Sequence, residues 1–234
     1  EIPTPTGVPA GTITTVPTQK LNPTPLPTTS PIPLSWKRLY TGAIFSRDTI
    51  TAIVVDPRDP NVIYAGTQNA GMYKTIDGGS SWKPVHNGLN SANVNALVID
   101  YQNAGTIYAV LSSGLHKTRD GGEHWEMVRF DSSILAIAMD PQNSQHLYLS
   151  TPSELFETND GGERWLSIQI SQCPKISSLK IDSRNVKTLF AVDGGYLDNA
   201  CSGGVYKSTD GGISWSNLNL QVKDLGLHEF DMAG

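Results

Sequence analysis

The residues best placed to do chemistry lie in one insertion, residues 193–203. It carries two carboxylates, Asp193 and Asp198, together with Tyr196 and Asn199. Glycoside hydrolysis needs two carboxylates about 5–9 Å apart across a sugar. No neighbouring feature marks these acids as a catalytic pair, so we name no catalytic residue and interpret the insertion as a binding loop.

Other kinds of site find less support in the sequence. The five histidines are His86, His116, His124, His146 and His228. They share no metal-ligand spacing, so we predict no metal site and interpret them as ordinary surface or half-buried residues. The glycine pairs precede strand-like runs, whereas a phosphate-binding glycine loop leads into a helix. We therefore predict no cofactor.

The composition limits the choice of partners. The 234 residues carry a net charge of −5 and contain no run of lysine and arginine, whereas a nucleic-acid-binding surface needs a basic stripe. No apolar stretch approaches the roughly 20 residues of a membrane-spanning helix. We therefore expect neither nucleic acid as a partner nor a transmembrane segment.

One short phrase, Ser/Thr-x-Asp-Gly-Gly-x-x-Trp, organises the elements that must position the candidate residues. It occurs at residues 75–82, 118–125, 158–165 and 208–215, and its aspartates are 43, 40 and 50 residues apart. A period of this size indicates repeated supersecondary units. Three β-prone runs precede each Trp, and a fourth begins at it. The first runs are residues 51–56, 96–100, 135–140 and 179–182, and each ends at an aspartate.

Four short antiparallel strands in each repeat are typical of a β-propeller blade. A β-sandwich could be built from the same hairpins, but it has no reason to repeat its sequence at this period. The predicted fold is therefore all-β: a β-propeller with four full blades and a fifth begun near Leu225.

The residues of the phrase suit a structural role. An Asp side chain can accept hydrogen bonds from the turn backbone, Gly allows positive φ, and Trp supplies a large apolar surface between blades. One carboxylate per turn is too few to bind calcium, which takes six to eight oxygens. The predicted structural residues are Asp77, Trp82, Asp120, Trp125, Asp160, Trp165, Asp210 and Trp215.

These phrases match the Asp-box, also called the BNR repeat. Over about residues 36–218 the chain resembles the Asp-box β-propellers, which include sialidases, xyloglucanase-type glycoside hydrolases, the sortilin luminal domain and photosystem II stability and assembly factors. The resemblance implies the fold. It does not imply one activity, because these families do different things on one scaffold.

In a propeller, the loops between second and third strands share a face with the loops that lead to the next blade. The Asp-box turns lie on the opposite face. The candidate functional loops are residues 68–70, 86–93, 112–113, 152–153, 171–174 and 193–203. We therefore add His86 to Asp193, Tyr196, Asp198 and Asn199 as candidate binding residues.

The two cysteines, Cys173 and Cys201, fall in neighbouring loops of this face. We predict a disulfide between them, which indicates an oxidising compartment. Two free thiols are the alternative.

Residues 1–34 contain nine Pro and nine Thr, with Glu1 and Lys20 as the only charges. Such a segment has little to bury, so we predict a disordered linker or stalk, followed by a partial propeller over residues 35–234. We expect a secreted, cell-surface or periplasmic protein, tethered through this stalk.

The preferred function is a non-enzymatic extracellular binding or assembly module whose partner is a protein or a polysaccharide. The first alternative is the N-terminal part of an Asp-box glycoside hydrolase. The second is a structural subunit of a surface filament or large complex, with self-association.

Overall fold

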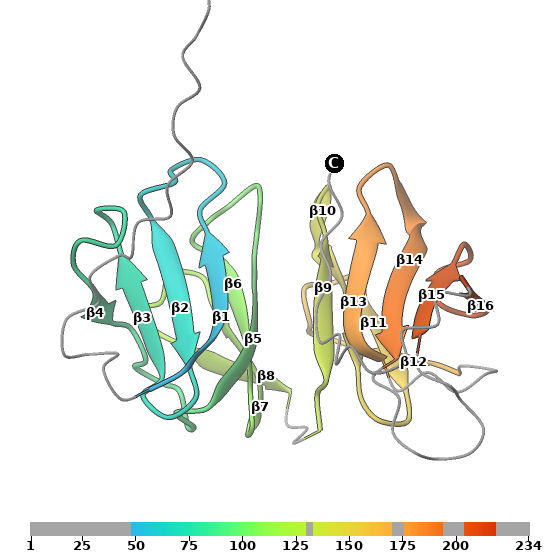
Figure 1. Ribbon diagram of the computed structural model, residues 1–234, viewed down its shortest axis with the longest axis horizontal. Helices are drawn as coiled ribbons and strands as arrows, with labels where there is room; N and C mark the ends of the chain where they lie inside the picture. Colours follow the sequence, from blue (N-terminus) through green and yellow to red (C-terminus); the bar gives the residue numbers. More distant parts are fainter. Residues whose placement is uncertain (1–47, 130–132, 170–175, 194–203, 219–234) are drawn as a thin grey trace, which may run out of the picture. The chain divides into compact units, whose positions relative to one another are not determined.

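A computed structural model describes residues 48–129, 133–169, 176–193 and 204–218. Within these ranges the chain forms β-strands and no helix, and the strands build four antiparallel sheets of four (Figure 1). In each sheet the strands follow one another in sequence order. The predicted stalk and the predicted start of a fifth blade lie outside the described residues.

Each sheet is one blade. Blade one consists of β1 (Ile50–Val55), β2 (Ile63–Thr67), β3 (Met72–Thr75) and β4 (Lys83–Pro84). Blade two consists of β5 (Val94–Ile99), β6 (Ile107–Leu111), β7 (Gly114–Thr118) and β8 (Glu126–Arg129). Blade three consists of β9 (Ala136–Asp140), β10 (Asn143–Ser150), β11 (Leu155–Thr158) and β12 (Leu166–Ile168). Blade four consists of β13 (Ile176–Asp182), β14 (Asn185–Asp193), β15 (Gly204–Ser208) and β16 (Ser216–Asn217).

An aspartate turns the chain at the end of the first strand of each blade. The Asp56 carboxylate accepts a hydrogen bond from the Arg58 N–H at 2.8 Å, and Asp140 does the same for Gln142 at 2.8 Å. This is an Asx turn, which ends the strand because the side chain takes over the role of a backbone acceptor. The fourth strands begin one residue later than the sequence predicts, directly after each Trp.

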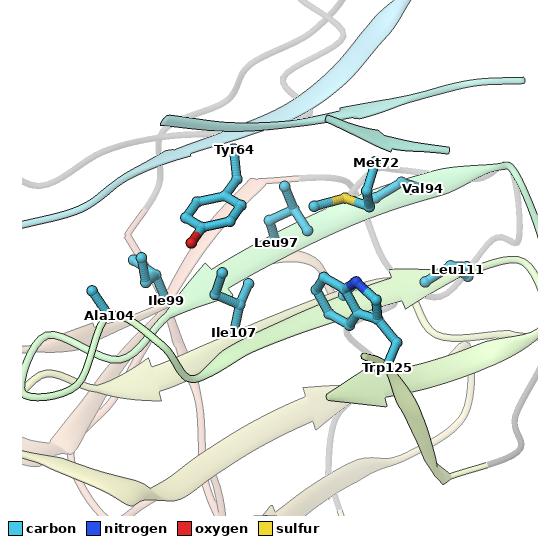
Figure 2. Packing of buried hydrophobic residues seen from close by; sticks show 10 residues of the cluster. Tyr64, Met72, Val94, Leu97, Ile99, Ala104, Ile107, Leu111 and Trp125 are labelled. Atoms are coloured by element: carbon cyan, nitrogen blue, oxygen red, sulfur yellow. The ribbon is translucent and has the colours of Figure 1, made fainter. Parts of the chain in front are cut away.

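The hydrophobic core is divided among the junctions between consecutive blades. Between blades one and two, Tyr64 and Met72 of the first pack against Leu97 and Ile107 of the second (Figure 2). Equivalent clusters join blade two to blade three and blade three to blade four. Strand alternation explains this, because one face of each sheet meets the preceding blade and the other meets the following blade.

The innermost strands β1, β5, β9 and β13 neighbour one another in that order. Together they line a cavity of about 290 Å³, with residues such as Thr51, Asn95, Leu135 and Lys180. A cavity lined by the first strand of every blade is what a propeller axis produces. Among the described residues, the structure has no helical segment with the length and apolarity of a membrane span.

Candidate functional site

Each repeated phrase forms a tight turn between the third and fourth strands of its blade. In the first, the Thr75 hydroxyl donates to Asp77 Oδ1 (2.7 Å) and accepts from the Gly79 N–H (2.9 Å), while Asp77 Oδ1 accepts from the Ser81 N–H (2.8 Å). Gly79 has a φ of 90°, a region that residues with a Cβ rarely adopt. The same bonds recur in the turns of Asp120, Asp160 and Asp210.

These hydrogen bonds hold the turn carboxyl groups in the ionised form. The Ser81 hydroxyl and N–H both donate to Asp77 and lower the pKa of that carboxyl to about 2. Donors at the corresponding positions lower the pKa of Asp210 to about 2 and also lower the pKa of Asp120 and Asp160. Both oxygens of Asp77 and of Asp210 accept hydrogen bonds within the turn, and Oδ1 of Asp120 and of Asp160 accepts two. These bonds reduce the number of lone pairs left for a ligand.

The same turns are joined to the loop between the first two strands of their blade. The Gly78 N–H donates to the Asn61 carbonyl oxygen at 3.0 Å, and the Gly121 N–H donates to that of Gly105 at 2.9 Å. The Asp-box turns and these loops therefore share one face of the propeller. Of the loops predicted to be functional, residues 68–70, 86–93, 112–113 and 152–153 lie at the other ends of the strands.

On that loop face, a cluster of amides and hydroxyls joins blades one and two. The Ser91 and Ser112 hydroxyls lie 2.8 Å apart, and the Ser113 hydroxyl donates to Asn90 Oδ1. The backbone supports these contacts, because the Ser112 N–H donates to the Asn93 carbonyl oxygen at 3.3 Å. We call Asn90, Ser91, Asn93, Ser112 and Ser113 the loop-face cluster. It consists of neutral hydrogen-bonding groups, of which Asn90 and Ser112 are exposed.

His86, a predicted binding residue, lies beside this cluster on the same loop. It is exposed, and its ring meets that of Tyr73 edge-on with centroids 6.5 Å apart. The ring lies against Gly71, where a Cβ would come within 3.2 Å of His86 Nδ1. The Gly71 N–H donates to the Ala92 carbonyl oxygen at 2.9 Å, which ties the His86 loop to blade one.

Of the other predicted binding residues, the structure describes only Asp193. Asp193 is the last residue of β14, is only 5% exposed, and pairs with Gly204 and Ile176 on the neighbouring strands. Tyr196, Asp198 and Asn199 lie outside the described residues. So do both cysteines, Cys173 and Cys201, and their disulfide stays a prediction.

Two histidines are more buried than their interpretation as surface or half-buried residues allowed. His116 is 1% exposed, and burial lowers its pKa. His146 is 7% exposed and lies between two carboxylates, with Nδ1 3.1 Å from Asp140 Oδ2 and Nε2 2.9 Å from Glu157 Oε1. The sequence does mark this contact, because Glu157 stands where the other three blades have a lysine.

Comparisons with known proteins agree with this fold. The Sortilin-Vps10 family model, described as sortilin, neurotensin receptor 3, matches residues 113–230. An ancestral GH74 enzyme is 25% identical over 78% of this chain, with a TM-score of 0.63. No curated protein gives a match.

Two further solved structures share the fold at lower identity. The GH74 xyloglucanase from Xanthomonas campestris is 21% identical over 71% of this chain, with a TM-score of 0.57. PorZ, a surface component of the type-IX secretion system of Porphyromonas gingivalis, is 12% identical over 72%, with a TM-score of 0.53. The chain covers 25% of the ancestral enzyme, 29% of the xyloglucanase and 22% of PorZ.

Proposed function

This chain belongs to the Sortilin-Vps10 family of Asp-box β-propellers, and we propose that it is a non-enzymatic extracellular binding module. Its partner is a protein or a polysaccharide, and it binds on the loop face of the blades. The fold positions this face, because the second strand of each blade ends there, at the side of the sheet opposite to the Asp-box turns.

The observation that carries the proposal is the chemistry of the loop-face cluster. It presents amides and hydroxyls that can both donate and accept hydrogen bonds, next to the aromatic edges of His86 and Tyr73. Neutral groups of this kind suit the hydroxyls of a sugar or the amides of a peptide. In this proposal the insertion at residues 193–203 adds Tyr196, Asp198 and Asn199 to the same face.

Family membership supports a binding role. The family description names neurotensin receptor 3, and a receptor is by its name a binding protein. The alternative, a part of a glycoside hydrolase, is supported by the 25% identity to an ancestral GH74 enzyme.

The described carboxylates of the loop face favour binding over hydrolysis. In the described ranges these are Asp48, Glu154 and Asp193. Asp48 accepts hydrogen bonds from the Asn69 N–H and Nδ2 at 3.0 and 3.1 Å, and Asp193 is buried at the end of its strand. A glycosidase pair instead needs two carboxyl groups that face the sugar from opposite sides.

The test uses two probes, xyloglucan and neurotensin, together with panels of other polysaccharides and peptides. Binding is measured on the whole chain, and released reducing sugar is measured in parallel. We expect saturable binding without turnover. Turnover of a bound polysaccharide supports the hydrolase alternative, and a filament seen by electron microscopy supports a structural subunit.

Variants then locate the site. The double substitution His86→Ala with Asn90→Ala removes a ring edge and an amide from the loop face, and we expect affinity to fall about tenfold or more. Asn159→Ala removes an exposed amide from the Asp-box face and serves as the matched control. Equal affinity of both variants and the unchanged protein contradicts the proposed site.

A further inference from the structure

A cavity of about 510 Å³ lies at the Asp-box face, where blades two and three meet. Blade two contributes Asp100, Thr106 and Lys117 to its walls, and blade three contributes Asp160 and Glu163. The three side chains of blade two are buried, with exposed fractions of 5%, 8% and 5%. Every residue that lines the cavity is polar or charged, so its walls offer hydrogen bonds to a ligand rather than apolar contact.

Asp100 has one carboxylate oxygen to which no described residue donates a hydrogen bond. Its Oδ1 accepts from the Gln102 N–H at 2.7 Å, and its own N–H donates to the Thr106 carbonyl oxygen at 3.0 Å. Within the described ranges nothing donates to Oδ2. Leaving a buried carboxylate oxygen without a donor costs free energy, so this oxygen needs a donor that enters the cavity.

Blade three fills the equivalent place with a side chain. His146 precedes the second-strand residue Leu147 as Thr106 precedes its own, and Asp140 stands where blade two has Asp100. His146 Nδ1 lies 3.1 Å from Asp140 Oδ2. The imidazole therefore supplies the partner that Asp140 Oδ2 has and Asp100 Oδ2 lacks.

The Asp-box turn of blade three places a second open oxygen on the cavity wall. In the turns of Asp77 and Asp210 a serine hydroxyl donates to Oδ2, at 2.6 and 2.5 Å. Arg164 stands at the position of that serine in blade three, and its backbone N–H donates to Asp160 Oδ1 at 2.9 Å. No described side chain donates to Asp160 Oδ2, so this oxygen can accept a hydrogen bond from a ligand.

Lys117 supplies a donor on the same walls. Its ammonium donates to the Gly161 carbonyl oxygen at 3.0 Å, and an ammonium has three N–H groups, so others are left for a ligand. Burial lowers the pKa of Lys117, while the carboxylates of Glu163, Asp100 and Asp160 act in the opposite direction. The cavity therefore combines carboxylate acceptors with a charged donor.

We propose that this cavity binds a small neutral polyol of the size of a monosaccharide. A hydroxyl both donates and accepts, so neighbouring hydroxyls of one ligand donate to Asp100 and Asp160 and accept from Lys117. Cationic ligands are disfavoured by Lys117 and by Arg119, which also lines the cavity, and anionic ligands are disfavoured by the carboxylates. The volume falls in the usual range of ligand pockets, about 300–1,000 Å³.

This site is separate from the loop-face cluster, because it lies at the opposite ends of the strands. It therefore stands or falls independently of the binding function proposed above.

The experiment measures the binding of glucose, mannose and myo-inositol to the whole chain by ligand-observed NMR, at concentrations up to about 50 mM. We expect saturable binding of at least one of them in the millimolar range. Arginine is the cationic probe and is not expected to bind. Absence of binding by all three polyols, or binding of arginine instead of them, overturns the proposal.

The substitution Thr106→His places the blade-three solution in blade two. We expect the imidazole to fill the cavity, to donate to Asp100 Oδ2 and to accept from Lys117, so polyol binding is lost while the melting temperature does not fall. Thr209→His makes the same change at an exposed position of the Asp-box turn of blade four, outside the cavity lining. It is the matched control and is expected to keep the affinity of the unchanged protein.

Asp100→Asn is the second variant and decides the question if Thr106→His does not fold. An amide keeps an acceptor for the Gln102 N–H but turns the second oxygen into a donor, so we expect the affinity for the polyol to fall about tenfold or more. Circular dichroism confirms that each variant is folded. Equal affinity of the folded variants and the unchanged protein overturns the proposed site.

Discussion

The ammonium group of Lys117 lies 4.9 Å from the centre of the Tyr108 ring, and both side chains donate to the Gly161 carbonyl oxygen, at 3.0 and 2.8 Å. The lysine and the tyrosine belong to blade two, and the glycine belongs to the Asp-box turn of blade three. The contact therefore joins two blades. The first glycine of the phrase therefore has a second role. It belongs to the turn of its own hairpin, and its carbonyl oxygen accepts hydrogen bonds from the preceding blade.

The first prediction concerns Lys117→Met, which keeps the length of the side chain and removes its charge. The variant loses a cation–π contact and a hydrogen bond, and we expect the free energy of unfolding to fall by about 1–3 kcal/mol. Burial lowers the pKa of Lys117, so part of the gain in these contacts is already offset by desolvation. Urea denaturation measures the difference. Lys83→Met, at an exposed lysine of β4, is the control, and an equal loss in both variants contradicts the role of the contact.

The second prediction concerns blade three, where this arrangement is replaced. Tyr148 pairs across the strands with Glu157, where Tyr108 pairs with Lys117. The Tyr148 hydroxyl donates to Glu157 Oε1 at 3.3 Å, and His146 contacts the same oxygen. Glu157→Lys alone places an ammonium beside His146 and removes a partner of that ring, so we expect a loss of stability.

The double variant Glu157→Lys with His146→Thr recreates the blade-two set, since Thr106 occupies the position of His146 there. We expect it to be more stable than Glu157→Lys alone, with a coupling energy of about 1 kcal/mol or more in a double-mutant cycle. Urea denaturation of the four proteins gives the cycle. Additive effects of the two substitutions contradict a restored lysine–tyrosine contact.

The fold could be predicted from the sequence because every repeat contains the same short-range signals. The Asp-Gly-Gly turn, the apolar runs and the aspartate after the first strand are short-range signals, and the structure places β1 at Ile50–Val55 where residues 51–56 were predicted. Each repeat alone predicts its strands weakly, but the recurrence of the same pattern in four repeats predicts the blade architecture strongly. The starts of the fourth strands were predicted one residue early, because a Trp that packs between blades resembles a strand residue in sequence.

The candidate site could be predicted only as a set of loops. His86 was identified by its loop, but Asn90 and Ser113 were not named, since the hydrogen bond between them depends on how two blades meet. Asp193 shows the opposite effect: the insertion begins with it, yet strand pairing continues through it and buries the side chain. His146 contacts both Asp140 and Glu157, which are 17 positions apart in the sequence. No recognisable sequence motif has this spacing, so the contact could not be predicted.

The third prediction concerns the acid limit of stability. Hydrogen bonds from Ser81 lower the pKa of the Asp77 carboxyl from an ordinary 3.8 to about 2 in the folded protein. Because the folded pKa is depressed, this group stabilises the fold fully above its ordinary pKa. The contribution is lost as the pH falls from about 4 towards 2.

Asp77→Asn tests this window, because an amide oxygen can still accept from the Ser81 N–H but does not titrate. We expect the variant to be less stable than the unchanged protein at neutral pH, and the difference in melting temperature to shrink between about pH 4 and 2. Glu123→Gln neutralises an exposed carboxylate in the turn of blade two and serves as the control, with a difference that stays small over the same range. A difference between Asp77→Asn and the unchanged protein that stays constant down to pH 2 contradicts the linkage, because the charge of Asp77 then contributes nothing that protonation removes.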